Sequence, residues 1–209
     1  MWLFENCEIK PIIPSLSHSQ DIIIAGIIDL YIPGKVIDMD PTYNTGGFYK
    51  SGKIRQPHFK FDIAPRLPEV RESDCRKLPL ENSSVRSIIF DPPFLGYSKG
   101  AYVEARYTTF ANYKELFLMY KESLAEFYRL LDMKGILIFK CQDTTEGNRV
   151  KFLHIDAVYK PALEIGFRAV DLFILASKWR PISINQAQNQ KHARKFHCYF
   201  WVFEKREWL

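Results

Sequence analysis

Stretches of apolar residues at helical spacing alternate along the chain with short, continuous apolar runs. Ser19 can cap a helix whose apolar body is Ile22 to Leu30, and Pro33-Gly34 would end that helix. The stretch from about Asn112 to Leu131 repeats its apolar residues at helical spacing, which predicts a long amphipathic helix. A further helix is predicted near Ile155 to Ile165.

The continuous apolar runs between these helices predict strands. They are Lys35–Met39, Phe59–Ile63, a weak one at Ser73–Arg76, Arg86–Phe90, Ile136–Cys141, Arg168–Ala176 and Phe196–Glu204. Strands that alternate with helices favour a mostly parallel sheet with both faces covered. We expect the last two strands to form an antiparallel hairpin, because the loop between them has no helical pattern.

The connection between the first two strands is too short for a full helix. Phe48 to Pro57 leaves room for barely one helical turn, so the sequence predicts an abbreviated first crossover and a thinly covered sheet face. A chain of 209 residues is long enough for one domain with a sizeable core. We therefore expect a single α/β domain over residues 1–209.

Composition narrows the class of protein. The longest apolar runs are far too short to span a bilayer, and no basic, apolar leader opens the chain, so we expect a cytoplasmic protein without a membrane partner. The cysteines are scattered without metal-like spacing, which favours free thiols in a reducing compartment and predicts no metal site. They are Cys7, Cys75, Cys141 and Cys198.

The chain is mildly basic, with a net charge of +5 and a pI of about 8.9. Basic residues gather between Lys50 and Lys60 and again between Lys178 and His197. Such clusters are typical of nucleic-acid contact and equally of a solvated face. The charge permits an anionic partner without requiring one.

Four acids follow successive predicted strands: Asp40, Asp62, Asp74 and Asp91. Ligands of parallel α/β sheets bind beyond the carboxyl ends of the strands, so the four carboxylates predict one shared small-molecule site. Asp62 lies where an acid would meet ribose hydroxyls, which indicates an adenosine-containing ligand.

The loop after the first strand reads Asp-Pro-Thr-Tyr-Asn-Thr-Gly-Gly, residues 40–47. Gly46 and Gly47 allow a sharp turn and a close approach of the backbone to a ligand. The loop has neither the G-x-G-x-x-G spacing of nicotinamide enzymes nor the G-K-[ST] of a P-loop. An oxidoreductase is therefore disfavoured.

The most specific motif is Asp91-Pro92-Pro93-Phe94, directly after a buried strand. The Asp91 carboxylate and the Pro92 carbonyl can accept hydrogen bonds from an exocyclic amine, and the prolines restrict the backbone that carries both acceptors. Phe94 offers a face on which a base can stack, worth about 1–3 kcal/mol per base. The alternative is a rigid loop with a phenylalanine in the core.

Together, the motif at residues 91–94 and the loop at residues 40–46 resemble the S-adenosylmethionine-dependent amino-methyltransferases, which methylate adenine N6 or cytosine N4, mostly in DNA. The resemblance implies a class I methyltransferase fold, a Rossmann-like three-layer sandwich. It also implies that S-adenosyl-L-methionine is the cofactor. Its methionine part would be held by the loop residues Asp40, Pro41, Thr42, Tyr43, Asn44 and Gly46. Asp62 would bind the ribose, Ile63 and Asp74 would lie near the adenine, and Asp91, Pro92, Pro93 and Phe94 would grip the target base. Asn44 replaces the first glycine of the family's loop, a mild change because Asn tolerates left-handed backbone.

The resemblance implies direct methyl transfer to a flipped-out base, with adenine N6 in DNA preferred over cytosine N4. The chain has no room for a separate recognition domain, so only the Leu95–Ala111 segment and the basic Lys178–Lys195 loop could read a target, unless a partner subunit does. RNA adenine methylation and a catalytically silent nucleic-acid-binding module stay open as alternatives. Protein glutamine methylation is less favoured, because such enzymes prefer Asn at the position of Asp91.

Overall fold

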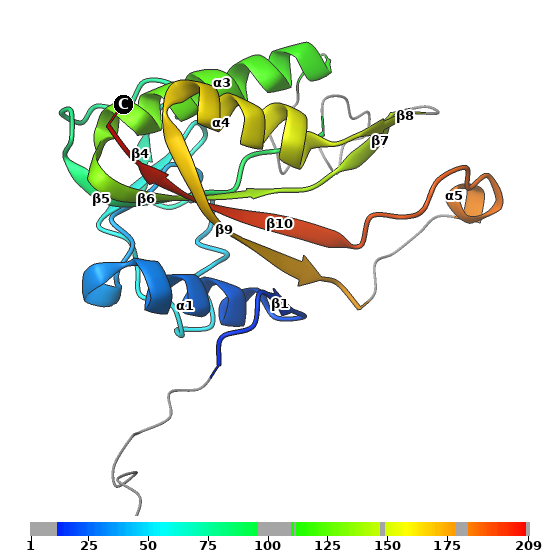
Figure 1. The fold of residues 1–209 in the computed structure, drawn as a ribbon, viewed down its shortest axis with the longest axis horizontal. Coiled ribbons are helices and arrows are strands. Elements are labelled where there is room, and N and C mark those ends of the chain that lie inside the picture. The colour runs from blue at the N-terminus through cyan, green and yellow to red at the C-terminus, as the bar shows by residue number, and fades with distance from the viewer. Residues whose placement is uncertain (1–11, 96–109, 111, 147–148, 179–183, 208–209) are drawn as a thin grey trace, which may run out of the picture.

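The computed structural model describes residues 12–95, 110, 112–146, 149–178 and 184–207. Within this part, eight strands form one sheet, in the order β1-β9-β10-β6-β5-β2-β3-β4 (Figure 1). Every strand runs parallel to its sheet neighbours except β10, which is antiparallel to both β6 and β9. The strands are β1 (Leu16–Ser17), β2 (Met39–Asp40), β3 (Phe59–Asp62), β4 (Arg71–Glu72), β5 (Val85–Phe90), β6 (Leu131–Cys141), β9 (Phe167–Ala176) and β10 (His197–Lys205).

Helices cover both faces of the sheet and so make three layers. One face carries α3 (Tyr113–Leu130), a π-helix (His154–Tyr159) and α4 (Lys160–Ile165), whereas α1 (Gln20–Tyr31) lies on the other face (Figure 1). Each interface has its own apolar core, with fully buried Leu124 and Phe127 on the α3 side and Ile24 and Ile27 on the α1 side. The predicted helices and the antiparallel terminal strands are confirmed.

The first crossover, predicted to hold an abbreviated helix, contains no helix at all between β2 and β3. The chain instead makes three successive tight turns, closed by backbone hydrogen bonds from Gly46 to Tyr43, Tyr49 to Gly46 and Gly52 to Tyr49. Buried aromatic rings fill the space that a crossover helix would occupy, and they pack in the same core as α1. They are Tyr43, Phe48 and Tyr49, with Ile54 beside them.

Two predicted strands are displaced. Lys35 to Met39 is not a strand: Pro33–Lys35 is a 3-10 turn, and β2 begins only at Met39. The reason is Asp38, whose carboxylate accepts hydrogen bonds from the backbone N–H groups of Arg86 and Ser87 in place of a strand ladder. The weak strand lies at Arg71–Glu72 rather than at Ser73–Arg76, where a turn runs from Asp74 to Lys77.

Four short elements were not predicted. β1 extends the sheet beside β9, a hairpin of β7 (Thr144–Glu146) and β8 (Arg149–Lys151) follows β6, and α5 (Ile184–Gln188) interrupts the loop expected to be free of helix. Each has five residues or fewer, too few to show a hydrophobic period. The remaining cysteines, Cys75, Cys141 and Cys198, are free thiols, whereas Cys7 lies outside the described residues. In the part of the chain that the structure describes, no helix is long and apolar enough to cross a bilayer.

Candidate active site at the carboxyl edge of the sheet

A cavity of about 700 Å³ lies beyond the carboxyl ends of β2, β3 and β5. It is placed where the sheet topology changes direction, because β2 has β3 on one side and β5 on the other. Most of the predicted site residues line it: Asp40, Pro41, Thr42, Tyr43, Asn44, Asp62, Ile63, Asp74, Asp91, Pro92 and Pro93. The fold therefore brings four strand-end carboxylates and most of the proline motif to one cavity.

Gly46 and Phe94 do not line this cavity. Gly46 has a positive φ of 69°, and a Cβ there would lie 2.6 Å from the Tyr43 hydroxyl oxygen, so its contribution is to let the turn close against Tyr43. Phe94 is half-buried and lines a neighbouring pocket on the other side of the motif. The backbone passes between the two pockets at residues 91–94.

Asp40 organises the loop that follows β2. Its buried carboxylate accepts hydrogen bonds from the Thr42 N–H (3.0 Å) and from the Tyr49 hydroxyl (3.0 Å). Burial raises the pKa of Asp40 to about 7, against the opposing effect of these hydrogen bonds. The charge on Asp40 therefore changes near neutral pH.

Asp62 joins this loop to the end of β3. Its two carboxylate oxygens accept hydrogen bonds from the backbone N–H groups of Asn44 and Ala64, both at 2.9 Å. Asn44 adopts the left-handed region with a φ of 50°, the conformation that Asn tolerates. Ile63, the residue after Asp62, is 49% exposed and presents an apolar side chain at the rim of the cavity.

Asp74 is held by Arg76. The Arg76 guanidinium donates to both Asp74 carboxylate oxygens, with Nη2 2.6 Å from Oδ2, and also pairs with Glu122. The hydrogen bonds from Arg76 lower the pKa of Asp74, so this acid stays ionised at neutral pH. Arg76 itself lines the cavity, which the sequence reasoning did not anticipate.

Asp91 is fixed from two neighbouring strands. Its backbone N–H donates to the Thr42 hydroxyl at 3.0 Å, and its carboxylate Oδ2 pairs with the Lys140 ammonium at 2.8 Å. Two residues further along the chain, the Pro93 carbonyl accepts a hydrogen bond from the Tyr120 hydroxyl at 2.7 Å. The motif is thus anchored at both ends by side chains distant in sequence.

Lys140 is a second site residue, besides Arg76, that sequence analysis missed. It is the penultimate residue of β6, only 13% of its side chain is exposed, and its Nζ lies 5.2 Å from the centre of the Phe48 ring. A lysine inside the apolar run Ile136–Cys141 was the available signal, because lysine is rarely buried without a partner. The partner itself could not be inferred, since it comes from another strand.

Comparisons with known proteins show the fold. The chain is similar to TrmN from Thermus thermophilus, with 16% identity and a TM-score of 0.52 over 90% of this chain and 50% of that one. A proposed sarcosine dimethylglycine methyltransferase from Galdieria sulphuraria has 12% identity and a TM-score of 0.55, covering 89% of this chain and 85% of that one. A proposed DNA modification methylase from Thermus thermophilus, solved with S-adenosyl-L-methionine, has 18% identity and a TM-score of 0.45, covering 65% and 54%.

The chain has the class I methyltransferase fold, a Rossmann-like α/β sandwich with a mostly parallel sheet. It spans about half the length of TrmN and of the proposed DNA modification methylase. No protein-family model and no curated protein sequence matches it. Identities this low define the class of fold and leave the substrate to the site itself.

Proposed function

We propose that this chain is an S-adenosyl-L-methionine-dependent methyltransferase that methylates the exocyclic amine of a base in nucleic acid, with adenine N6 in DNA as the preferred target. The observation that carries the proposal is the placement of Asp91, Pro92 and Pro93 in the wall of the same cavity that the residue 40–44 loop and Asp62 line. A cofactor held by the loop and a target held by the motif would then meet in one space.

The cavity suits this cofactor in size and in donor set. Its lining balances four carboxylates with four basic side chains, which fits a ligand that carries an amino group, a carboxylate and a sulfonium. The residue 40–44 loop and Gly46 would shape the methionine part of the site, Asp62 would hold the ribose, and Ile63 and Asp74 would border the adenine. When bound, S-adenosyl-L-methionine supplies an electrophilic methyl group on its sulfonium.

Asp91 would activate the amine. The exocyclic nitrogen of adenine is a poor nucleophile because its lone pair is delocalised into the ring. Hydrogen bonds from its two N–H groups to Asp91 Oδ1 and the Pro92 carbonyl would localise that lone pair towards the methyl group and stabilise the positive charge that develops on nitrogen. As the N–C bond formed, the methyl–sulfur bond would break to leave a neutral thioether, and the Asp91 carboxylate would take the surplus amine proton. Lys140 engages Oδ2, which is why we assign the proton-accepting role to the other oxygen.

The proposal also assigns a role to Phe94 and names the parts of the chain that would contact the target. Phe94 would stack on the target base from the neighbouring pocket. Most of the Leu95–Ala111 segment lies outside the described residues, so the basic residues before β10 are the described candidates for target contact. A separate recognition subunit is the further partner that we propose for sequence-specific DNA methylation.

The experiment is methyl transfer from tritium-labelled S-adenosyl-L-methionine to matched pools of DNA and RNA, followed by mass analysis of the nucleosides. We expect N6-methyladenine in DNA. Incorporation only into RNA would assign RNA as the substrate, and N4-methylcytosine would change the target base. No transfer together with no cofactor binding by calorimetry would favour a silent binding module.

A further inference from the structure

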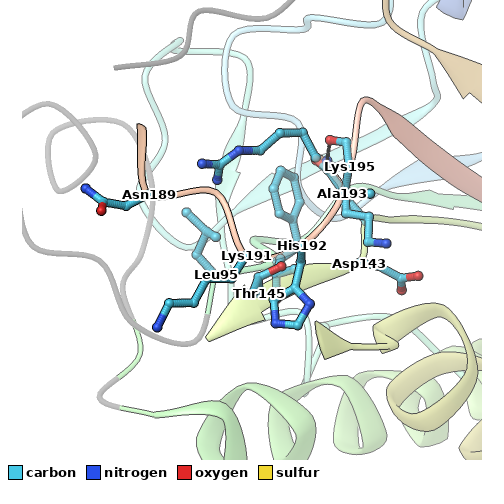
Figure 2. A pocket seen from close by; sticks show the side chains of 12 residues that line it. Leu95, Asp143, Thr145, Asn189, Lys191, His192, Ala193 and Lys195 are labelled. Carbon is cyan, nitrogen blue, oxygen red and sulfur yellow. Dashed lines mark hydrogen bonds between the residues drawn. The ribbon is translucent and has the colours of Figure 1, made fainter. Parts of the chain in front are cut away.

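A second pocket, of about 860 Å³, includes Phe94 of the proline motif in its lining and adjoins the cavity described above, which we call the cofactor cavity after its proposed ligand. It is lined by Phe94 and Leu95 after β5, by residues 142–145 after β6, and by a segment before β10, residues 189–195, which we call the strap. Figure 2 shows Lys191, His192 and Lys195 on the strap, and Asp143 and Thr145 on the segment that follows β6. All three parts belong to the carboxyl edge of the parallel strands.

The two pockets differ in charge. The strap contributes three basic side chains, Lys191, Arg194 and Lys195, to the second pocket. The single carboxylate of this pocket is that of Asp143, which is 2% exposed and lies 2.8 Å from Nδ1 of His154. An excess of cations over acids favours an anionic ligand here, whereas the charges of the cofactor cavity balance.

The strap is anchored where it meets the sheet. The Gln142 side chain donates to the Lys195 carbonyl at 2.7 Å, and the Ser177 N–H donates to the Phe196 carbonyl at 2.6 Å. These bonds fix the backbone of Lys195 beside Gln142, the first residue after β6. The cationic side chains are therefore presented close to the motif by an ordered support.

We propose that the strap binds the sugar-phosphate backbone of the strand that carries the target base, with Lys191 and Lys195 as phosphate contacts. This inference rests on the proposed function, and it narrows the substrate to a polynucleotide rather than a free nucleoside or a protein amide. Phe94 supports it, because a half-buried ring in the same pocket supplies a stacking surface beside the cations, the combination that single-stranded nucleic-acid sites use.

The test is fluorescence anisotropy with a labelled single-stranded oligodeoxynucleotide of about 20 nucleotides, long enough for a site of this kind. The double variant Lys191→Glu/Lys195→Glu is compared with Lys121→Glu/Lys160→Glu, which makes the same charge change at two exposed lysines of α3 and α4. We expect at least tenfold weaker binding for the strap variant. The slope of log affinity against log salt should also fall by about 1.4, at about 0.7 per phosphate contact. The control should bind like the parent.

Equal losses in both double variants, or no loss in the strap variant, would overturn the inference. So would displacement of the oligonucleotide by deoxyadenosine monophosphate or inorganic phosphate at concentrations equal to that of the oligonucleotide. A matched RNA strand shows which polynucleotide is preferred. Cofactor binding by calorimetry verifies that the strap variant is folded.

The strap and the methyltransferase proposal fail separately. Strap-dependent oligonucleotide binding without methyl transfer would retain the strap and reject the function. Methyl transfer with unchanged binding in the strap variant would retain the function and reject the strap.

Discussion

The ammonium of Lys140, near the end of β6, lies 2.8 Å from carboxylate Oδ2 of Asp91, the first residue after β5. β5 and β6 are parallel neighbours in register from Ser87 to Phe90, so both residues come to the same edge of the sheet. The pair is partly shielded, with 13% of the Lys140 and 29% of the Asp91 side chain exposed. Shielding strengthens the ion pair relative to a surface pair and holds the carboxylate in one orientation.

Asp91→Ala should abolish methyl transfer while cofactor binding persists. The change removes the acceptor that would localise the amine lone pair, and loss of one such group typically costs on the order of 10²–10³ in rate. Single-turnover transfer and calorimetric binding of the cofactor measure the two effects. Asp156→Ala is the control, because Asp156 is an exposed acid paired with Lys160 on the outer helices. Retained activity in Asp91→Ala would reject the assigned target site.

Lys140→Met should lower the transfer rate about tenfold or more, because Asp91 then loses the partner that orients its carboxylate. Reaction rates are sensitive to small displacements of a catalytic group. Lys140→Arg should recover part of the rate, since a guanidinium can still pair with the carboxylate. Rates are compared at saturating cofactor and nucleic acid. A rate equal to that of the parent in Lys140→Met would mean that the ion pair serves stability alone, which urea denaturation of the same variants reports.

Asp40→Asn should change how stability depends on pH. The pKa of Asp40 is about 7 in the folded chain against an ordinary value of 3.8 for Asp, so between these values the folded state binds more protons than the unfolded state. Its contribution to the free energy of unfolding is therefore largest at low pH and is lost as the pH rises towards 7. Asparagine cannot ionise, so this decline should disappear in the variant.

Urea denaturation at several values between about pH 5 and about pH 8 measures the effect, which depends on the difference in bound protons. Relative to the parent, Asp40→Asn should gain stability as the pH rises. Asp29→Asn, at an exposed acid paired with Lys35, should follow the parent curve. Parallel curves for Asp40→Asn and the parent would show that Asp40 is not the group that titrates.

Gly46→Ala should be more harmful than Gly52→Ala. Both glycines have positive φ, 69° and 74°, so both substitutions carry backbone strain of about 1–2 kcal/mol. At Gly46 the new Cβ would also lie 2.6 Å from the Tyr43 hydroxyl oxygen, whereas nothing lies within 4 Å at Gly52. We expect the Gly46 variant to lose about 1 kcal/mol more stability and to bind the cofactor more weakly. Equal losses of unfolding free energy in the two variants, measured by urea denaturation, would show that the Tyr43 side chain moves away from the new Cβ without cost.

Local pattern was sufficient for much of this fold. The helical period of α3 and the capping Asn112, whose side chain accepts from the Glu115 N–H, define a helix almost to the residue. The acids that end successive strands located the cavity, because parallel strands place their carboxyl ends at one edge. β2 was displaced because the Asp38 side chain, rather than any local pattern, bonds to β5.

The sequence by itself determined the alternation of strands and helices, the shortness of the first crossover and the acids and prolines at strand ends, since each depends on neighbours along the chain. Tertiary structure decided that Lys140 meets Asp91 and that Phe94 shares a second pocket with the strap. These relationships join residues brought together only by strand order and register. A single sequence shows which residues can ionise or stack, but it does not show which of them line the same cavity.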